Sequence, residues 1–158
     1  MQAGELCGMD ATGILATNDA DALLASDADC VCYTAAGDTR PEEAVDDMCR
    51  ILASGKNVVS TSVVALVHPT TFDPSVSAKL AAACEEGGTS FFNSGIDPGF
   101  ANDFLPLALS GLSENWNEIR ILEIVNYATY DRPEILFDVM GFGGSLDETP
   151  LLLLDGVL

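Results

Sequence analysis

The feature that most constrains this chain is a regular alternation of short apolar runs with segments of helical periodicity. Each of the first four apolar runs, which are typical of buried strands, is followed by a segment whose apolar residues recur at helical spacing. The expected strands are residues 13–17, 29–34, 57–61 and 89–93, and the expected helices are residues 19–26, 41–54, 74–86 and 100–112. Strands separated by helices of this length connect through right-handed crossovers, so the pattern predicts an α/β fold with a parallel sheet and helices on both faces.

Local signals mark the ends of these helices. Pro41 suits the first helical turn, where its missing N–H would have no partner, and Gly55 is a typical residue after a helix. Asp73 is placed to cap the third expected helix. Pro106 lies inside residues 100–112, so we expect it to kink or split that helix.

The sequence changes character near Asn115. Residues 118–130 are rich in β-branched residues with partial alternation, which predicts a strand of a different, antiparallel or mixed sheet. We therefore expect a first domain at residues 1–115 and a second at residues 116–158. The second segment is too short to bury a core of its own well, so we expect it to be the beginning of a domain that this chain does not complete.

The charge of the chain excludes several classes of partner. Six Lys and Arg residues against 25 Asp and Glu residues give a formal net charge of −19. This charge repels nucleic-acid phosphates and anionic membrane surfaces, so we expect neither as a partner. No apolar run approaches the roughly 20 residues that a membrane span needs, and the N-terminal residues do not read as a secretory signal.

The cysteines and the single histidine argue against a metal centre. None of the five cysteines forms a C-x-x-C pair, and His68 is the only histidine, so a zinc site or a Ser-His-Asp triad would lack partners. Cys30 and Cys32 would point the same way from one strand. We interpret the cysteines as buried free thiols in a reducing compartment, which predicts a cytoplasmic protein without a metal.

Polar and small residues gather where the expected strands end. In an open parallel sheet, ligands bind beyond the carboxyl ends of the strands. Thr34 and Ala35 follow the second expected strand, and Thr61 and Ser62 follow the third. Ordinary loop composition would account for any one of these positions, but their succession favours a polar ligand that lies across the edge of the sheet.

The most informative stretch is residues 93–100, which follow the fourth expected strand. Gly95 and Gly99 permit tight backbone turns, and Pro98 stiffens the loop and holds the preceding residue extended. The carboxylate of Asp97 would thus be fixed at the mouth of the sheet, where it could bind an ammonium or imine nitrogen. The alternative is that Asp97 only caps the helix that starts just after it.

The residues alone do not identify the ligand. A dinucleotide-binding unit opens with a strand, a G-x-G-x-x-G loop and a helix, and no such fingerprint occurs in these 158 residues. Gly4, Gly8 and Gly13 have a different spacing and precede no expected helix. The pattern therefore predicts an α/β domain that binds a ligand at its strand ends.

Four segments together resemble a known enzyme family. Residues 29–34, 55–62, 94–100 and 123–127 are similar to runs of the dihydrodipicolinate reductase-like NAD(P)-dependent dehydrogenases, above all the 2,4-diaminopentanoate dehydrogenase-like branch. The Asp-Pro-Gly turn also resembles that of diaminopimelate dehydrogenase. The resemblance implies an incomplete Rossmann-type domain, followed by the start of an α/β, mixed-sheet domain for substrate binding and oligomerisation. It also implies NAD or NADP as cofactor, hydride transfer to or from an amino or imino substrate, and a homo-oligomer for the full-length protein.

The resemblance implies a nicotinamide site at the strand ends. Thr34 and Ala35 match the loop that passes near the nicotinamide ribose. Ser60, Thr61 and Ser62 match the contact after the next strand. These five residues are the candidate cofactor-binding residues.

The resemblance also implies a substrate site. Asp97 matches the turn aspartate that lies near the reacting amine, which makes it the candidate catalytic residue. Asn93, Gly95 and Tyr127 are the candidate substrate-binding residues, with a packed strand position as the alternative for Tyr127. Residues 126–132 contain neither the His-His pair nor the Lys of dihydrodipicolinate reductases proper, which favours a different amino substrate.

Two other functions stay open. Family members carry the glycine-rich fingerprint ahead of the position of Met1 and continue past Leu158, so the resemblance implies an internal piece of a longer protein. One alternative is therefore an inactive fragment or oligomerisation remnant that binds no cofactor. The other is a Rossmann-type oxidoreductase that acts on a hydroxyl or aldehyde substrate.

Overall fold

The computed structural model describes residues 1–70 and 72–154, and the last residues of the expected second domain, 155–158, lie outside the described residues. The chain divides into two compact units, Met1–Gly95 and Ile96–Leu158. This division precedes the helical segment that leads to Asn115, where the composition changes.

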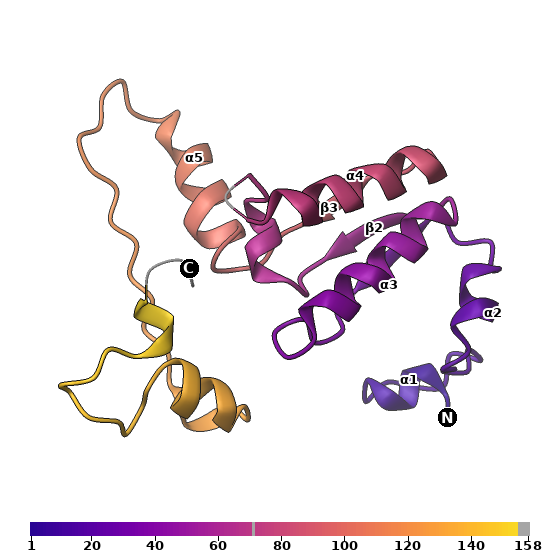
Figure 1. Ribbon diagram of the computed structural model, residues 1–158, viewed down its shortest axis with the longest axis horizontal. Helices are drawn as coiled ribbons and strands as arrows, with labels where there is room; N and C mark the ends of the chain where they lie inside the picture. The colour runs from indigo at the N-terminus through magenta and orange to yellow at the C-terminus, as the bar shows by residue number, and fades with distance from the viewer. Residues whose placement is uncertain (71, 155–158) are drawn as a thin grey trace. The chain divides into compact units, whose positions relative to one another are not determined.

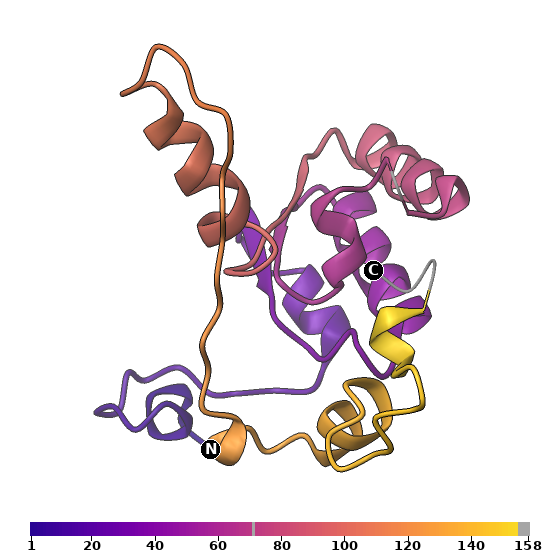
Figure 2. The ribbon, with the colours of Figure 1, turned by 90° about the vertical axis from the view of Figure 1, so that its left-hand side faces the viewer.

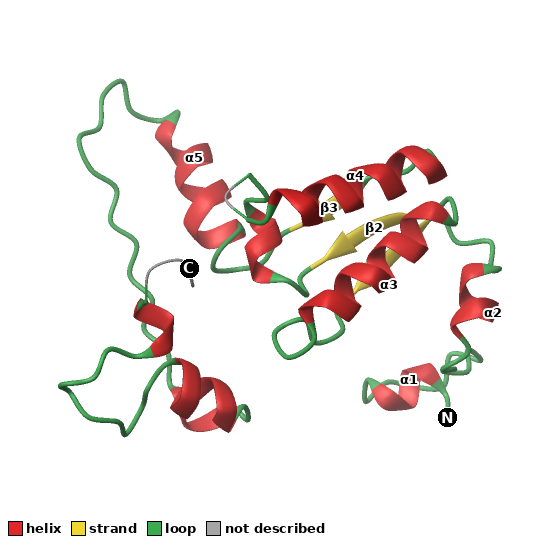
Figure 3. Ribbon diagram, viewed as in Figure 1, coloured by secondary structure: helices red, strands yellow, loops and turns green. Residues whose placement is uncertain are grey.

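The first unit contains a three-stranded parallel sheet (Figure 3). Its strands are β1 (Cys30–Tyr33), β2 (Asn57–Ser60) and β3 (Phe91–Asn93), and they lie in the order β1-β2-β3. The three strands coincide with three of the four expected from the sequence, and their parallel pairing confirms the partial α/β fold.

Both long helices of this unit cover the same face of the sheet. α3 (Pro41–Ala53) and α4 (Pro74–Gly87) pack against each other on one side of the strands (Figures 1 and 2). The expectation of helices on both faces is therefore wrong for the described sheet. The reason is the strand order: because the chain moves in one direction from β1 to β3, successive right-handed crossovers place their helices on the same side.

The core lies between these two helices and the covered face of the sheet. Met48 and Leu52 of α3 are fully buried, as is Ala44, and Val58 of β2 faces them at 2% exposure. The remaining core residues come from α3, α4 and the turn η1 (Val64–Val67) with the residue before it: Val45, Val63, Leu66, Leu80 and Ala83. Burial of such side chains contributes about 1.5–3 kcal/mol each relative to exposure, which makes this layer the main stabilising element of the unit.

The helix ends follow the local signals of the sequence. Pro41 is the first residue of α3, and the carboxylate of Asp73 accepts a 2.8 Å hydrogen bond from the N–H of Ser75 at the start of α4. α4 ends at Gly88, whose φ of 64° is the left-handed conformation that glycine adopts without strain.

The N-terminal segment forms no strand. It contains the short helices α1 (Ala3–Leu6) and α2 (Ala20–Leu24), while the expected strand at residues 13–17 makes only an isolated bridge between Leu15 and Gln2. That prediction is wrong because an apolar run becomes a strand only beside a partner, and Leu15 remains 66% exposed. The loop after α2 is tied to the sheet by the buried Lys56, whose Nζ donates to the carbonyl oxygens of Ser26 and Ala28.

The second unit is built from short helices and extended chain. It contains the π-helical turn η2 (Phe100–Phe104), α5 (Leu105–Ser110), and the turns η3 (Tyr127–Thr129), η4 (Glu134–Val139) and η5 (Leu151–Leu153). The expected helix at residues 100–112 is split, with Pro106 as the second residue of α5. No helix of the described residues has the length and apolar character needed to cross a membrane.

The expected strand at residues 118–130 is absent from the described unit. Residues 118–126 have no regular secondary structure and pair with no neighbouring strand, and η3 interrupts the rest. Ile124 is 95% exposed and Leu122 is 86% exposed. The prediction is wrong here because β-branched composition favours a strand only where another backbone is present to pair with it.

Candidate functional site

The strand ends of the first unit bring most of the predicted cofactor-binding residues together. The hydroxyl of Ser62 donates to the carbonyl oxygen of Ala35 at 2.6 Å, and the N–H of Ser62 donates to Oγ of Ser60 at 3.0 Å. The N–H of Thr61 donates to the carbonyl oxygen of Tyr33, the residue before Thr34. The loops after β1 and β2 are therefore joined at the carboxyl edge of the sheet.

Gly37 is required by this close approach. A Cβ at Gly37 would lie 2.4 Å from the carbonyl oxygen of Ser62 and 2.5 Å from its hydroxyl. No side chain tolerates such distances, so only glycine lets the loop after β1 pass against Ser62. The same contact fills the space beside Gly37, which leaves no cradle for a ligand at that glycine.

Asn93 closes the cluster at the end of β3. Its side chain is 7% exposed, and Nδ2 donates to the carbonyl oxygen of Val63 at 3.0 Å. The N–H of Ser94 donates to the carbonyl oxygen of Ser60, which joins the third strand end to the second. The buried Oδ1 of Asn93 has no hydrogen-bond partner among the described residues. A buried acceptor without a partner is costly, so this atom marks the place in the cluster where a further donor would be stabilising.

This cluster fits one part of a dinucleotide. The exposed Thr34 and Thr61 and the joined loops offer hydroxyl and carbonyl groups to the nicotinamide and its ribose. The diphosphate would need a glycine-rich loop, and the sequence contains none with the required spacing. The residues present therefore fit the nicotinamide end and lack the groups for the diphosphate.

A charged network supports the end of β1, and sequence reasoning missed it. The hydroxyl of Tyr33 donates to Oδ2 of Asp47 at 2.8 Å, and Nη2 of Arg40 donates to the same oxygen at 2.7 Å. Desolvation acts to raise the pKa of Asp47, but the hydrogen bonds from Arg40 and Tyr33 outweigh it and hold the pKa below its usual value. Partial burial and the bond to Asp47 raise the pKa of Tyr33. The network fixes the loop that carries Thr34 between its two ends.

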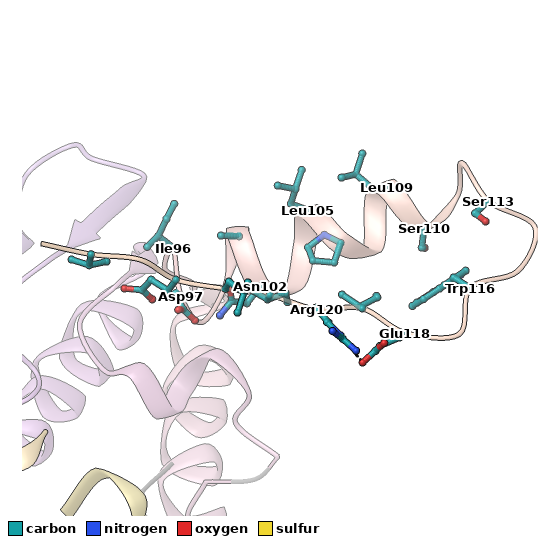
Figure 4. Close-up of a pocket in the computed structure, with 17 residues that line it drawn as sticks. Ile96, Asp97, Asn102, Leu105, Leu109, Ser110, Ser113, Trp116, Glu118 and Arg120 are labelled. Atoms are coloured by element: carbon teal, nitrogen blue, oxygen red, sulfur yellow. Dashed lines mark hydrogen bonds and ion pairs between the residues drawn. The ribbon is translucent and has the colours of Figure 1, made fainter. Parts of the chain in front are cut away.

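The second unit contains a groove of about 790 Å³ that is lined by Asp97 (Figure 4). The segment η2–α5 forms one wall, and residues 116–125 form the other. Most of the lining is apolar, including Pro106, Trp116 and Ile119. Sites for small molecules are commonly concave and apolar with a few polar groups, as here.

Asp97 does not cap the helix that follows it. The N-cap position of η2 is Gly99, and the N–H of Gly99 donates to Oδ2 of Asp103 at 2.8 Å. The φ of Gly99 is 132°, which a side chain would not adopt without strain, and the Asp97–Pro98 peptide is cis. Asp97 itself is exposed and faces the groove.

The partner of Asp97 is Glu123, which sequence reasoning did not identify. Glu123 lines the opposite wall of the groove. A hydrogen bond with the Asp97 carboxyl, together with desolvation and the charge of Asp97, raises the pKa of Glu123. Two carboxyl groups that share a site in this way hold one proton more tightly than an isolated carboxyl does.

Other charged groups of the groove are already paired. Nε of Arg120 donates to Oε1 of Glu118 at 2.8 Å, and both side chains line the groove. The acidic character of the Asp97–Glu123 end is therefore not neutralised by Arg120. This end of the groove can bind a cationic group.

The remaining candidate residues lie elsewhere. Gly95 is the last residue of the first unit. Tyr127 is half-buried in η3, where its ring packs edge-on against Phe142 at 5.3 Å and Tyr130 at 6.1 Å between ring centroids. Tyr127 is not among the residues that line the groove, and its role in substrate binding stays a prediction.

The cysteines are less buried than expected. Cys7, Cys30 and Cys32 are exposed, and Cys49 and Cys84 are half-buried. The expectation of buried thiols is wrong at Cys30 and Cys32 because these side chains lie on the sheet face that the helices leave uncovered. Within residues 1–70 and 72–154, no group of three or more His, Cys, Asp or Glu side chains could hold a metal ion.

The sequence is similar to that of a longer protein. It is 42% identical over 156 residues to a protein named amine dehydrogenase from Streptomyces virginiae. The match covers 98% of this chain and 43% of the relative, so the chain spans less than half the length of the curated relative it matches. No protein-family model matches the sequence, and no solved structure matches it.

Proposed function

We propose that this chain is part of an NAD(P)-dependent oxidoreductase that acts on CH–NH groups, an amine dehydrogenase or imine reductase similar to the dihydrodipicolinate reductase-like enzymes. The observation that carries the proposal is the pair of carboxyl groups, Asp97 and Glu123, in an apolar groove. A protonated amine is attracted by such a pair, whereas a hydroxyl or aldehyde group carries no charge to neutralise. The name of the Streptomyces virginiae relative supports the same class of reaction.

The residues of the groove would bind the amine and move one proton. The nicotinamide, when bound, supplies or accepts the hydride. In the direction of oxidation, the ammonium first loses a proton, because the nitrogen lone pair must form the C=N bond as hydride leaves the adjacent carbon. Asp97 and Glu123 would hold the ammonium and receive this proton, and in the direction of reduction they would return it to the nitrogen.

The raised pKa of Glu123 suits this task. The hydrogen bond with Asp97, desolvation and the charge of Asp97 act together to raise it. A carboxyl with a raised pKa is a stronger proton acceptor than an ordinary Glu. Asp97 would remain the candidate catalytic residue, with Glu123 as the group that shares its proton.

The walls of the groove favour an amine with a hydrocarbon body. Pro106, Trp116 and Ile119 would contact the apolar part of the substrate and exclude water from the reacting nitrogen. Among the described lining residues, the one cation is Arg120, which is already paired with Glu118. A substrate carboxylate would therefore find no unpaired cation in the groove, which favours simple primary amines over amino acids.

The two units would have different binding roles. In this proposal the strand-end cluster of the first unit, with Thr34, Ala35, Ser60, Thr61 and Ser62, holds the nicotinamide end of NAD or NADP. The residues after Gly95 carry the substrate groove. The domain assignments 1–115 and 116–158, the cytoplasmic location and the homo-oligomer stay predictions.

The test uses a hybrid in which this chain replaces the matching region of the Streptomyces virginiae relative. Formation of NADH or NADPH is followed with primary amines, amino acids, hydroxy acids and alcohols as substrates. We expect turnover with primary amines, and we expect Asp97→Asn and Glu123→Gln to lower kcat at least tenfold while NADPH affinity changes less than twofold. Glu118→Gln is the matched control, since it removes a carboxylate of the same groove that already has a partner.

Three results would contradict the proposal. Equal losses of turnover and NADPH affinity in Asp97→Asn would show that Asp97 serves the cofactor or the fold instead of the amine. Oxidation of hydroxy acids or alcohols without oxidation of amines would favour the hydroxyl or aldehyde alternative. A hybrid that is folded but gives no fluorescence change with NADPH would favour the remnant that binds no cofactor.

A further inference from the structure

Asn102 is a polar residue of the groove that has no role in the proposed function. It lies in η2, is half-buried and lines the groove. The side chains of Asn57, Asn93 and Asn126 all hydrogen-bond to backbone groups. The side-chain amide of Asn102, in contrast, makes no hydrogen bond to another of the described residues. Its oxygen and its NH₂ group are therefore both open to a ligand in the groove.

The backbone of η2 places Asn102 next to Asp97. The N–H of Ala101 donates to the carbonyl oxygen of Ile96 at 2.8 Å. Because this bond closes a loop between the two residues, the residue after Ala101 lies beside the residue after Ile96. Turns of this π-helical kind are rare and are frequent at functional sites. In Figure 4, Asp97 and Asn102 lie towards one end of the groove and Trp116 lies towards the other.

This end of the groove therefore presents three polar side chains. The carboxyls of Asp97 and Glu123 hydrogen-bond to each other, and the amide of Asn102 lies on the same wall as Asp97. All three side chains carry oxygen atoms that accept hydrogen bonds. A primary ammonium has three N–H donors, as the lysine head group has, whereas a secondary ammonium has two. The number of acceptor side chains thus matches a primary amine.

We propose that Oδ1 of Asn102 accepts the third N–H of a primary ammonium that Asp97 and Glu123 hold, which makes the groove selective for primary over secondary amines. The inference rests on the proposed function, since the two carboxyls have to bind the nitrogen. In a secondary amine, a second alkyl group takes the place of one N–H. That group would lie against the amide oxygen of Asn102, which would lose its contact with water and gain no partner.

Charge and hydrogen-bond number separate the roles of the three side chains. Asp97 and Glu123 supply the electrostatic attraction, which primary and secondary ammonium groups feel equally because each carries one positive charge. Asn102 is neutral, so it discriminates between them only through the hydrogen bond. The alternative role of Asn102 is to donate from Nδ2 to the Asp97 carboxyl and hold it in place. That role would affect both amines alike, so the ratio of the two affinities distinguishes the two roles.

Trp116 gives a direct readout of binding. It is the only tryptophan of the chain, it lines the groove and it is 51% exposed, so its fluorescence reports the entry of a ligand. The chain is titrated at neutral pH with hexylamine, N-methylhexylamine and hexan-1-ol, which share one hydrocarbon body. Both amines are protonated under these conditions, as lysine is. We expect hexylamine to bind about fivefold more tightly than N-methylhexylamine, which corresponds to one hydrogen bond, and hexan-1-ol to bind more weakly than either amine.

Two variants of Asn102 test its oxygen atom. Asn102→Leu removes the amide and keeps the approximate size of the side chain, so we expect the two amines to bind with affinities within about twofold of each other. Asn102→Asp keeps an oxygen acceptor at the same place, so we expect the preference for hexylamine to remain. Circular dichroism shows whether each variant is folded.

Two further variants are controls for other parts of the groove. Asp97→Asn should weaken the binding of both amines by the same factor and leave their ratio unchanged, because it removes attraction for either cation. Ser110→Ala removes a hydroxyl of the same groove that already donates to the carbonyl oxygen of Leu107 at 2.6 Å, so the ratio should not change.

The outcomes separate this inference from the proposed function. Equal affinities of hexylamine and N-methylhexylamine for the unmodified chain would overturn the role of Asn102 and leave the proposed function standing. A preference for hexylamine that persists in a folded Asn102→Leu chain would do the same and would assign the discrimination to the shape of the walls. Should Asn102→Leu not fold, equal affinities in Asn102→Asp would contradict the inference. Binding of hexan-1-ol as tight as that of the amines, or no change of Trp116 fluorescence with any of the three, would contradict the proposed function together with this inference.

Discussion

Gly87, the last residue of α4, lies against the backbone at the end of α3, and its replacement by Ala tests the packing of these two helices. A Cβ at Gly87 would lie 1.9 Å from the carbonyl oxygen of Leu52 and 3.2 Å from Cα of Ala53. Both contacts are with backbone, which cannot rotate away as a flexible side chain could. The last turn of α4 would have to move by about 1 Å, which is the kind of shift that overpacking a core produces.

The expected loss of unfolding free energy in Gly87→Ala has three contributions. Overpacking of this kind costs about 1–3 kcal/mol. The hydroxyl of Thr89 donates to the same carbonyl oxygen of Leu52 at 3.1 Å, and its loss costs about 1 kcal/mol. Alanine regains at most about 1 kcal/mol over glycine in a helix, and less at the last residue of α4. The net loss of unfolding free energy is about 2 kcal/mol, which lowers the midpoint of a unit of this size by about 8–16 °C.

Thermal unfolding followed by circular dichroism gives the measurement. Gly111→Ala is the control, because the nearest atom to a Cβ at Gly111 is the carbonyl oxygen of Ala108 at an ordinary 3.7 Å. Gly88→Ala is the comparison for backbone strain alone: nothing lies within 4 Å, but φ is +64°, so we expect a loss of about 1 kcal/mol. Unfolding of Gly87→Ala at the wild-type temperature would refute the close approach of the two helices.

Two further changes test the electrostatic contacts of the same unit. Asp47→Asn should lower the unfolding free energy by about 0.5–1 kcal/mol at pH 7, with allowance for solvent screening of the Arg40–Asp47 pair, whose side chains are 40% and 45% exposed. The pKa of Asp47 is lower in the folded state than in the unfolded state. Its contribution to the unfolding free energy is therefore present above the unfolded-state pKa and disappears as the pH falls through the folded-state pKa. A difference in urea unfolding between wild type and Asp47→Asn that persists in strong acid would contradict this assignment. Lys56→Met should cost about 2 kcal/mol in urea unfolding, since the carbonyl oxygens of Ser26 and Ala28 lose a buried charged donor. Lys79→Met, which removes the exposed pair with Asp46, should change little, and equal effects of the two lysine variants would argue against the tethering role of Lys56.

The elements that the sequence predicted well are those specified by local chemistry. α3 begins at Pro41, and α4 is capped by Asp73 and ended by Gly88, all of which act within one turn of the helix. The three strands of the sheet were predictable because each apolar run lies between two such helices. Pro106 likewise splits its helix through its own missing N–H and ring.

The elements that the sequence did not predict depend on partners far along the chain. Residues 13–17 and 118–130 have strand composition but lack a neighbouring backbone, so the same composition gives an isolated bridge and an extended segment. The uncovered sheet face depends on strand order, which local patterns do not contain. Glu123 became a site residue only because the chain returns past Asp97, and no spacing rule links those two positions.

The pairing of the Lys and Arg side chains bears on how the chain could bind a cofactor diphosphate. All six Lys and Arg side chains have acidic or carbonyl partners within the described residues: Arg40 with Asp47, Arg50 with Asp21, Lys56 with Ser26 and Ala28, Lys79 with Asp46, Arg120 with Glu118, and Arg132 with Glu134. A diphosphate that approached this chain would meet a net charge of −19 and would have to break an existing ion pair to gain a cation. Backbone N–H groups at a helix N-terminus bind phosphate without any cation, and α3 begins with a proline, which offers no N–H at its first residue. The described residues therefore offer a diphosphate no cation that lacks a partner.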